Sequence, residues 1–396
     1  MHMNNDTGAP DKDLTAEKDT TPENTEAEVR AERIHDAVLL CCGAVFLLAC
    51  VVLGVCRMNK GSAFSEFVCT GISVALRKAL AFATSFAPFS VCEALAVAAV
   101  LYIIVRAVTY AARRDKFRKT LFFKRVTSAA LVIASCVYMS YAVLFTRKPV
   151  NEYIGLDREE VSADDLTLAC GYVTDKLNAL VERREVYFDP EDFSEMPYSF
   201  SELGDKVNAA YASLTQKEEY SFLTKMNVKA KPLLVSKYMT YTHISGVYTP
   251  VTGEANINLN YPDYVIAFTY AHELAHQRGV APEDEANFMA YLVLLESDDP
   301  YLNYSAYRYV LDYLQGALFT ADYDKCVEVV RGTAPEILRE ETAYSAFFDK
   351  YRDSGASKVA DVVNDTNLKL NDQTAGVRSY GLVTDLVVAH IKAQTE

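Results

Sequence analysis

The residues best suited to chemistry form the string His272-Glu273-Leu274-Ala275-His276. On a helix, positions i and i+4 lie on the same face, so both imidazoles can bind one zinc ion. Glu273 would lie beside that ion, where its carboxylate can accept a proton from a water that the metal activates. The pattern therefore predicts a zinc site with Glu273 as the catalytic base.

A catalytic zinc site also needs a third protein ligand and an open fourth position. Gly279 can end the first helix, and Pro282 can begin the next one. That second helix begins with two candidate carboxylates, Glu283 and Glu285. Their side chains diverge by about 200° around a helix, so only one of them can easily reach the metal. Spacing alone leaves both as candidates.

The string Glu283-Asp284-Glu285-Ala286-Asn287 resembles the Glu-x-x-Ala-Asp/Asn motif of gluzincin metallopeptidases, such as the membrane prenyl-protein and heat-shock types. The resemblance implies that Glu283 is the third ligand and that Asn287 supports a ligand histidine. Six residues separate His276 from Glu283, fewer than in most gluzincins, so Glu285 remains the alternative ligand.

The chain after its acidic N-terminal tail also resembles a bacterial membrane family catalogued as domain of unknown function 3810. The most specific part of this resemblance is the block HELAHQRG followed by EDEANFMAY, within residues 272–291. It implies three N-terminal transmembrane helices followed by a zincin-like domain.

The segment before the motif is a candidate for substrate binding. Glu254, Asn256 and Asn258 alternate with apolar residues, which predicts a strand with one polar face. If this is an edge strand, it can pair with an extended peptide. A half-buried strand without a binding role is the alternative.

Three further residues are candidates for stabilising an oxyanion beside the zinc. They are His243, near the end of a predicted strand, and Tyr304 and Tyr307, just after the metal motifs. An imidazole or a phenol can donate a hydrogen bond to a developing negative charge. The chain has 26 tyrosines and no tryptophan, so packing is the alternative role for each tyrosine.

The elements that must position these residues lie in 149–396. Residues 163–184 and 200–224 have helical periodicity, residues 233–242 and 246–260 resemble short strands, and helical periodicity returns after Pro262. Helices, a small sheet and further helices predict an α+β domain.

Charge divides the chain into three regions. Residues 1–36 have 4 basic and 10 acidic residues, residues 37–148 have 14 and 3, and the remainder has 21 and 40. The net charge of −14 argues against a general nucleic-acid binder. The polar first region predicts a disordered acidic tail on the cytoplasmic side.

Residues 37–148 are predicted to form a membrane domain, with the lipid bilayer as a partner. Residues 37–56, 90–112 and 126–145 are apolar runs of about the length that crosses a bilayer. They predict three transmembrane helices. Residues of about 61–87 have an amphipathic pattern, which predicts a helix in the membrane interface.

The charges of the loops predict the orientation of a multi-pass cell-membrane protein. Residues 113–125 contain seven Lys or Arg against one Asp, and basic loops stay in the cytoplasm. The N-terminus is then cytoplasmic and residues 149–396 are extracytoplasmic. The loop before the second apolar run has four basic residues, which oppose this assignment more weakly.

These observations predict a membrane-anchored zinc metallopeptidase that hydrolyses an envelope or extracellular protein or peptide. The alternative is a non-catalytic membrane sensor or assembly factor that binds an envelope ligand in the same domain. The chain has no CxxC pair, which argues against a thiolate zinc site. Cys170 and Cys326 could form a disulfide or remain free thiols. The sequence gives no oligomeric state.

Overall fold

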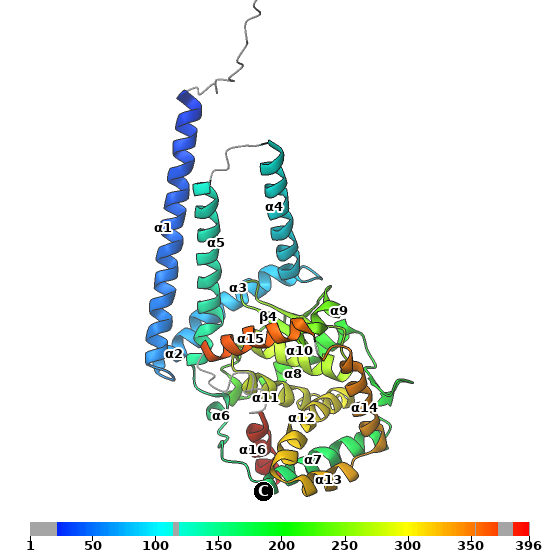
Figure 1. Cartoon of the computed structure of the whole chain (residues 1–396). Helices are drawn as coiled ribbons and strands as arrows, with labels where there is room; N and C mark the ends of the chain where they lie inside the picture. The colour runs from blue at the N-terminus through cyan, green and yellow to red at the C-terminus, as the bar shows by residue number, and fades with distance from the viewer. Residues whose placement is uncertain (1–21, 114–118, 353, 371–382, 396) are drawn as a thin grey trace, which may run out of the picture.

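The computed structural model describes residues 22–113, 119–352, 354–370 and 383–395. In these ranges the chain is mostly helical, with a three-stranded sheet and a two-stranded hairpin. The long helices α1 (Pro22–Met58), α4 (Val91–Arg113) and α5 (Lys119–Ser140) extend from one end of a helical domain (Figure 1). The α+β class expected from the sequence is thus confirmed at the level of a mostly helical chain with a small sheet.

Four of the described helices are long and apolar enough to cross a membrane. They are Val29–Met58, Ala63–Ser85, Val91–Thr109 and Thr120–Thr146. Helices α1 and α5 pack along each other, whereas no residue in the apolar window of α4 is buried. Apolar side chains exposed along a whole helix fit a lipid environment, consistent with a membrane protein.

The second of these four helices is one run made of α2 (Ala63–Phe67), the π-helical η1 (Val68–Ile72) and α3 (Ser73–Ser85). It lies across the ends of the long helices, next to the domain (Figure 1). The run confirms the helix expected over about 61–87. Its length and composition make it a fourth candidate span, where the sequence analysis counted three.

The N-terminal tail differs from the expectation. Helix α1 begins at Pro22, so residues 22–36 are helical and the prediction of disorder is wrong for them. The segment EAEVRAER has good helix formers directly before an apolar helix, so adding residues to that helix avoids the cost of nucleation. The rest of the predicted tail, residues 1–21, lies outside the described residues.

The domain begins after α5. Its helices are η2 (Ala142–Thr146), α6 (Val150–Tyr153), α7 (Ala163–Glu182), α8 (Phe200–Leu214), η3 (Glu218–Tyr220), α9 (Ser236–Met239), η4 (Thr240–Thr242), α10 (Asp263–Arg278), α11 (Glu283–Leu295), α12 (Pro300–Ala321), α13 (Tyr323–Arg331), α14 (Pro335–Asp349), α15 (Gly355–Leu370) and α16 (Val383–Thr395). Its strands are β1 (Tyr187–Phe188), β2 (Ser194–Glu195), β3 (Lys231–Pro232), β4 (Gly246–Thr249) and β5 (Glu254–Ile257).

The three-stranded sheet has the order β3-β5-β4, with β3 parallel and β4 antiparallel to β5. Val247 of β4 lies opposite Asn256 of β5. Strand β5 is therefore central and buried along its length, and the prediction that it is an edge strand is wrong. Alternation along a strand shows that its two faces differ, but it does not show which neighbours pair with it. The outer edge beside α10 belongs to β4.

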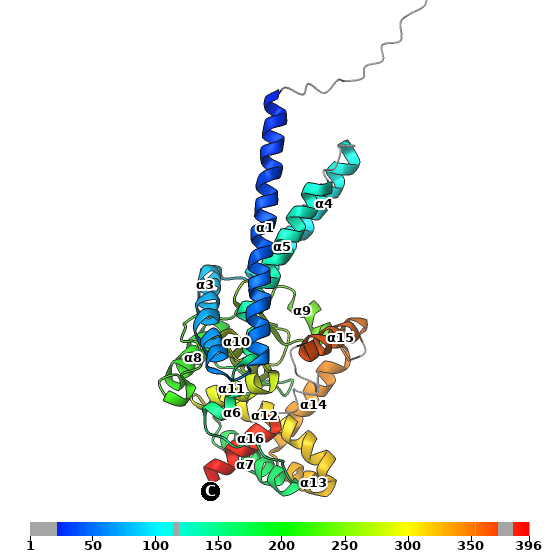
Figure 2. The ribbon, with the colours of Figure 1, turned by 90° about the vertical axis from the view of Figure 1, so that its left-hand side faces the viewer.

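Helices α10 and α11 form the centre of the domain. All residues of α10 from Tyr264 to Arg278 are buried, as are all but the last of α11. A helix buried on every side has no amphipathic stripe, which explains its continuous apolar and aromatic composition. Helix α12 packs on both, and α7 and α16 pack on α12 at the end away from the long helices (Figures 1 and 2). Cys170 and Cys326, both buried in this bundle, are free thiols in the structure.

Candidate metal centre

Two consecutive helices position the residues of the predicted metal site. His272, Glu273 and His276 lie on the last two turns of α10. Gly279 ends this helix with a φ of 106°, a conformation that glycine adopts without steric cost. Glu283 is the first residue of α11, directly after Pro282. The short turn between the helices folds the carboxylate back towards the two histidines.

His272, His276 and Glu283 form the one three-residue group among the described residues that could hold a metal ion. Their candidate donor atoms all lie within 4.8 Å of one another. The Oε2 atom of Glu283 lies 3.2 Å from Nε2 of His272 and 3.5 Å from Nε2 of His276. Ligand atoms of tetrahedral zinc are about 3.3 Å apart, since each lies about 2.0 to 2.1 Å from the metal. The donor set and its spacing therefore fit zinc.

The surroundings of the histidines leave their Nε2 atoms facing the carboxylate. Nδ1 of His276 donates to the carbonyl of Val280 at 2.7 Å, which leaves Nε2 as the nitrogen that a metal would bind. Burial would lower the pKa of His276, but Glu283 outweighs it and raises this pKa to about 9. Burial would raise the pKa of Glu283, but the charge of His276 and the hydrogen bonds from both histidines hold it well below its usual range.

The neighbours of Glu283 on α11 have other partners. Glu285 accepts a hydrogen bond from Nη2 of Arg147 at 2.6 Å, and both side chains are buried. Asp284 accepts from Nη2 of Arg158 at 2.8 Å. Of the two candidate third ligands, the structure thus brings Glu283 to the histidines and directs Glu285 to an arginine.

Asn287 lies one turn after Glu283. Its amide lies near the hydroxyl of Tyr313 on α12, whose pKa also responds to Glu283. Nδ2 of Asn287 is buried with no hydrogen-bond partner among the described residues. The structure therefore places Asn287 beside the cluster, with Tyr313 as its neighbour. The sequence analysis expected Asn287 to contact a ligand histidine and did not select Tyr313.

Glu273 lies beside the cluster and against strand β4. The backbone N–H of Tyr248 donates to its carboxylate, and its Oε2 is buried without a partner among the described residues. Burial raises the pKa of this carboxyl group, while the histidines and the Tyr248 N–H act in the opposite direction. A Cβ on Gly246 would lie 2.7 Å from Cγ and Oε1 of Glu273, so the edge strand can approach this closely only with glycine there.

The side of the centre towards the long helices is built from membrane-proximal residues that the sequence analysis did not assign to the site. The ring of Tyr141, just after α5, lies 5.9 Å from that of His276, and its hydroxyl donates to the carbonyl of Ala281 at 3.3 Å. Arg77 of α3 is buried against Gly279 and donates to Thr224 at 2.8 Å. Ala281 also belongs to an apolar cluster with residues of α1, η1 and η2. The turn between His276 and Glu283 is thus enclosed by chain segments far from it in sequence.

The residues predicted to bind substrate on β5 have internal partners instead. Glu254 pairs with Lys231 at 2.6 Å and accepts from the backbone N–H groups of Val91 and Cys92, both at 2.9 Å. Asn256 donates within the sheet, and Asn258 donates to the carbonyl of Ile244 at 3.0 Å. All three side chains are buried: Glu254 holds the sheet to the start of α4, whereas Asn256 and Asn258, the latter directly after β5, bond to the backbone of residues 244–247.

The three oxyanion candidates also lie away from the cluster. His243 contacts the carbonyl of Tyr351 at 2.8 Å, Tyr304 donates to Glu340 at 2.6 Å, and the ring of Tyr307 packs on that of Tyr291. Tyr313 is the tyrosine of α12 whose pKa responds to Glu283, and Tyr307 and Tyr304 precede it by about 1.7 and 2.5 helical turns. Periodicity placed these tyrosines on one helix, but it could not show which of them lies near Glu283.

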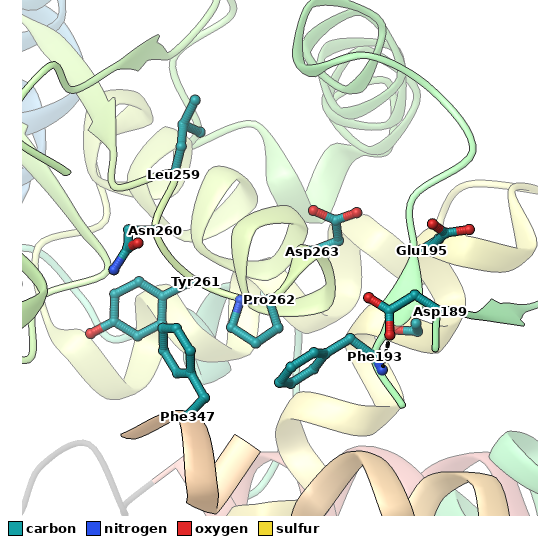
Figure 3. Close-up of a pocket in the computed structure, with 10 residues that line it drawn as sticks. Asp189, Phe193, Glu195, Leu259, Asn260, Tyr261, Pro262, Asp263 and Phe347 are labelled. Carbon is teal, nitrogen blue, oxygen red and sulfur yellow. Dashed lines mark hydrogen bonds between the residues drawn. The ribbon is translucent and has the colours of Figure 1, made fainter. Parts of the chain in front are cut away.

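A cavity of about 330 Å³ lies at the other end of α10 (Figure 3). Asp263, the first residue of α10, lines it and lies nine positions before His272, or about 13 Å along the helix. Asp263 accepts from the backbone N–H of Met196 at 2.9 Å, and Asp189 accepts from that of Phe193 at 2.8 Å. This cavity is therefore separate from the metal cluster.

Comparison with known proteins gives one match. The family described as "Protein of unknown function (DUF3810)" matches residues 69–388, from η1 to α16. The matched range includes α3, α4 and α5 together with the domain that holds the cluster. No curated protein and no solved structure matches the chain.

Proposed function

Because the chain belongs to the DUF3810 family, whose description assigns no activity, we propose its function from the site: a membrane-bound, zinc-dependent metallopeptidase with a zincin-like domain. The observation that supports this most directly is the Glu273 carboxylate. It is buried beside three metal donors, and one of its oxygens has no partner among the described residues. A purely structural zinc site needs no such base and is normally closed by four protein ligands.

His272, His276 and Glu283 would hold the zinc, which leaves a fourth position open. Bound zinc would lower the pKa of a water molecule to about 7 and polarise the carbonyl of a peptide bond. The unpartnered oxygen of Glu273 accepts the proton of the attacking water. The same carboxylate then donates this proton to the amine that leaves.

Strand β4 is the element best placed to hold a substrate. It is one of the two outer strands of the sheet, and its Tyr248 backbone N–H reaches Glu273. Val247 on the same strand is 40 % exposed. An extended peptide that pairs with this edge would present its backbone beside the base and the metal.

The proposed location follows from the charges and the four apolar helices. We place α1, α4 and α5 across the cell membrane and the α2–α3 run in its interface. The basic loop between α4 and α5 is then cytoplasmic, and the domain is extracytoplasmic. The substrate is accordingly a peptide or protein outside the cytoplasm.

The first test measures zinc in the full chain purified in detergent. We expect about one zinc per chain in the wild type and a large loss in His272→Ala, since a catalytic site has three protein ligands. His35→Ala is the matched control, because His35 lies on α1 beside Arg125 and away from the cluster. A folded, zinc-supplied wild type that contains no zinc would disprove the proposal.

The second test separates catalysis from metal binding. Glu273→Gln should keep its zinc and lose about 10²- to 10⁴-fold in hydrolysis of a peptide library followed by mass spectrometry, since the base is removed. Glu341→Gln, at an exposed position on α14, is the control. If Glu273→Gln hydrolyses peptides as fast as the wild type, Glu273 is not the base. If zinc is bound but the wild type cleaves nothing, the non-catalytic sensor becomes the better hypothesis.

A further inference from the structure

A group of large apolar side chains is exposed on the domain itself, outside the long helices. Leu234 is 83 % exposed, Tyr238 is 77 % exposed and Val235 is 48 % exposed. They lie within five consecutive residues, around the short helix α9. Leu233, Ser236 and Thr240 of the same segment are buried, so the segment has a packed inner face and an apolar outer face. We call Leu234, Val235 and Tyr238 the α9 surface.

The α9 surface is bonded directly to the start of a candidate membrane span. The carboxylate of Glu93, the third residue of α4, accepts from the backbone N–H groups of Leu234 at 2.9 Å and Val235 at 3.1 Å. Three residues of helix cover about 5 Å along its axis. The α9 surface therefore lies at the same depth as the first turn of α4.

A second set of contacts fixes the same arrangement. Glu254 of β5 accepts from the first two backbone N–H groups of α4 and pairs with Lys231 of β3. Nζ of Lys231 also donates to the carbonyl of Thr84 on α3 at 2.6 Å. The side chains of Lys231 and Glu254 are both buried. The sheet, whose strand β3 directly precedes α9, is thus held to both α3 and α4, so α9 has a fixed position relative to them.

The end of α3 and the turn that leads from it to α4 expose further large apolar side chains, close in sequence to Glu93. Phe82 is 77 % exposed, Phe86 is 84 % exposed and Phe89 is 47 % exposed. In both views α9 lies at the end of the domain that faces the long helices (Figures 1 and 2). Exposed apolar patches of this kind mark binding surfaces, and aromatic residues are enriched where a bilayer meets water.

We propose that the α9 surface is a membrane-docking site that inserts into the bilayer interface beside the first turn of α4. The proposed partner is lipid. The α9 surface lies beside the first turn of α4, and no residue in the apolar window of α4 is buried inside the protein. Exposed Lys237 lies within the segment and can reach lipid phosphates, while Leu234 and Tyr238 contact the acyl boundary. The α9 segment leads through η4 into β4, so docking would hold this edge strand at the membrane surface.

The chain contains no tryptophan, so one introduced tryptophan reports on its own surroundings. We would place Tyr238→Trp in the full chain, reconstituted in phosphatidylcholine nanodiscs with one chain each. Lipids with bromine on the acyl chain close to the headgroup quench tryptophan on contact. Tyr323→Trp is the control, because Tyr323 is 59 % exposed on α13 at the end of the molecule opposite the long helices.

We expect brominated lipid to quench Tyr238→Trp several-fold more strongly than Tyr323→Trp, with emission shifted to shorter wavelength. Leu234→Trp should behave like Tyr238→Trp, which protects the test against one variant that fails to fold. Equal quenching of the three variants would overturn the proposal, because the α9 surface would then lie no closer to lipid than Tyr323 on α13. The measurement needs neither zinc nor hydrolysis, so its result is independent of the proposed peptidase activity.

Discussion

Two buried arginine–carboxylate clusters hold the central helices, and they connect them to different parts of the molecule. The first joins Arg147, between η2 and α6, to Glu285 on α11 at 2.6 Å. The guanidinium group lies 5.7 Å and 5.0 Å from the ring centroids of Tyr153 and Phe222. This cluster attaches the ligand-bearing helix to the segment that leaves α5.

The second cluster joins α12 to α14. Nε of Arg308 lies 3.4 Å from Oε2 of Glu340, and both side chains are fully buried. Glu340 also accepts from the hydroxyl of Tyr304 at 2.6 Å and from the backbone N–H of Ser194 at 2.8 Å. The guanidinium lies 5.2 Å from the ring centroid of Tyr264 in the first turns of α10.

The difference lies in distance from the metal donors. Glu285 is two residues after Glu283, whereas Tyr264 precedes His272 by eight residues, or about 12 Å along α10. Removing the arginine from either cluster should destabilise the fold, since it leaves a buried carboxylate without its charged partner. Only the first cluster should also determine where Glu283 points. Metal binding is therefore expected to depend on the Arg147–Glu285 cluster more than on the Arg308–Glu340 cluster.

The largest effect is expected for Arg147→Met. This change leaves Glu285 buried with only the backbone hydrogen bond from Val150, and an uncompensated buried charge costs about 3 to 5 kcal/mol. We expect a loss of stability near the upper end of that range and weaker zinc binding by the folded fraction. Thermal unfolding and zinc content of the full chain in detergent would measure both.

The double variant Arg147→Met/Glu285→Gln is the matched control for this prediction. Removing both charges should restore part of the stability, because no charge is left buried and unpaired. If the unpaired charge of Glu285 displaces the turn between His276 and Glu283, zinc affinity of the folded protein should recover together with the stability. An Arg147→Met variant that binds zinc as tightly as the wild type would contradict the role assigned to the first cluster.

Arg308→Met tests the other side of the comparison. Glu340 keeps its hydrogen bonds from Tyr304 and Ser194, so the loss of stability should be near the lower end, about 3 kcal/mol. Zinc affinity of the folded fraction should stay at the wild-type value. The same two measurements apply. A loss of zinc affinity equal to that of Arg147→Met would remove the distinction between the clusters.

Much of the candidate site could be predicted because its residues are close in sequence. His272, Glu273 and His276 lie within two turns of one helix, and Gly279 and Pro282 mark the turn that returns Glu283 to them. The choice between Glu283 and Glu285 needed Arg147, which lies 138 positions from Glu285. A sequence pattern encodes local geometry, but it does not show which distant side chain satisfies a buried charge.

The fold follows the same rule. Ser162 and Ser199 form capping boxes that begin α7 and α8, a signal present in the local sequence. The order of the strands could not be predicted from the local sequence. Strands β3 and β5 pair although 24 residues separate Lys231 from Asn256, and β5 is central only because β4 pairs with its other edge. For this reason Glu254 was interpreted as a substrate contact, when its partners are Lys231 and the start of α4.

The smallest effect is expected for Tyr141→Phe. This change tests whether the single hydrogen bond from Tyr141 to the turn before Glu283 affects zinc affinity. The change removes the hydrogen bond to the carbonyl of Ala281 and keeps the ring beside His276, so it should cost about 1 kcal/mol of stability. Zinc affinity, measured by competition with a chelator, should fall by no more than about tenfold. Tyr138→Phe is the control about one turn earlier in the chain, since the ring of Tyr138 lies against that of Phe46 on α1. If both variants weaken zinc binding equally, the effect comes from helix packing in general. If only Tyr141→Phe does, the end of α5 acts on the turn that lies between His276 and Glu283.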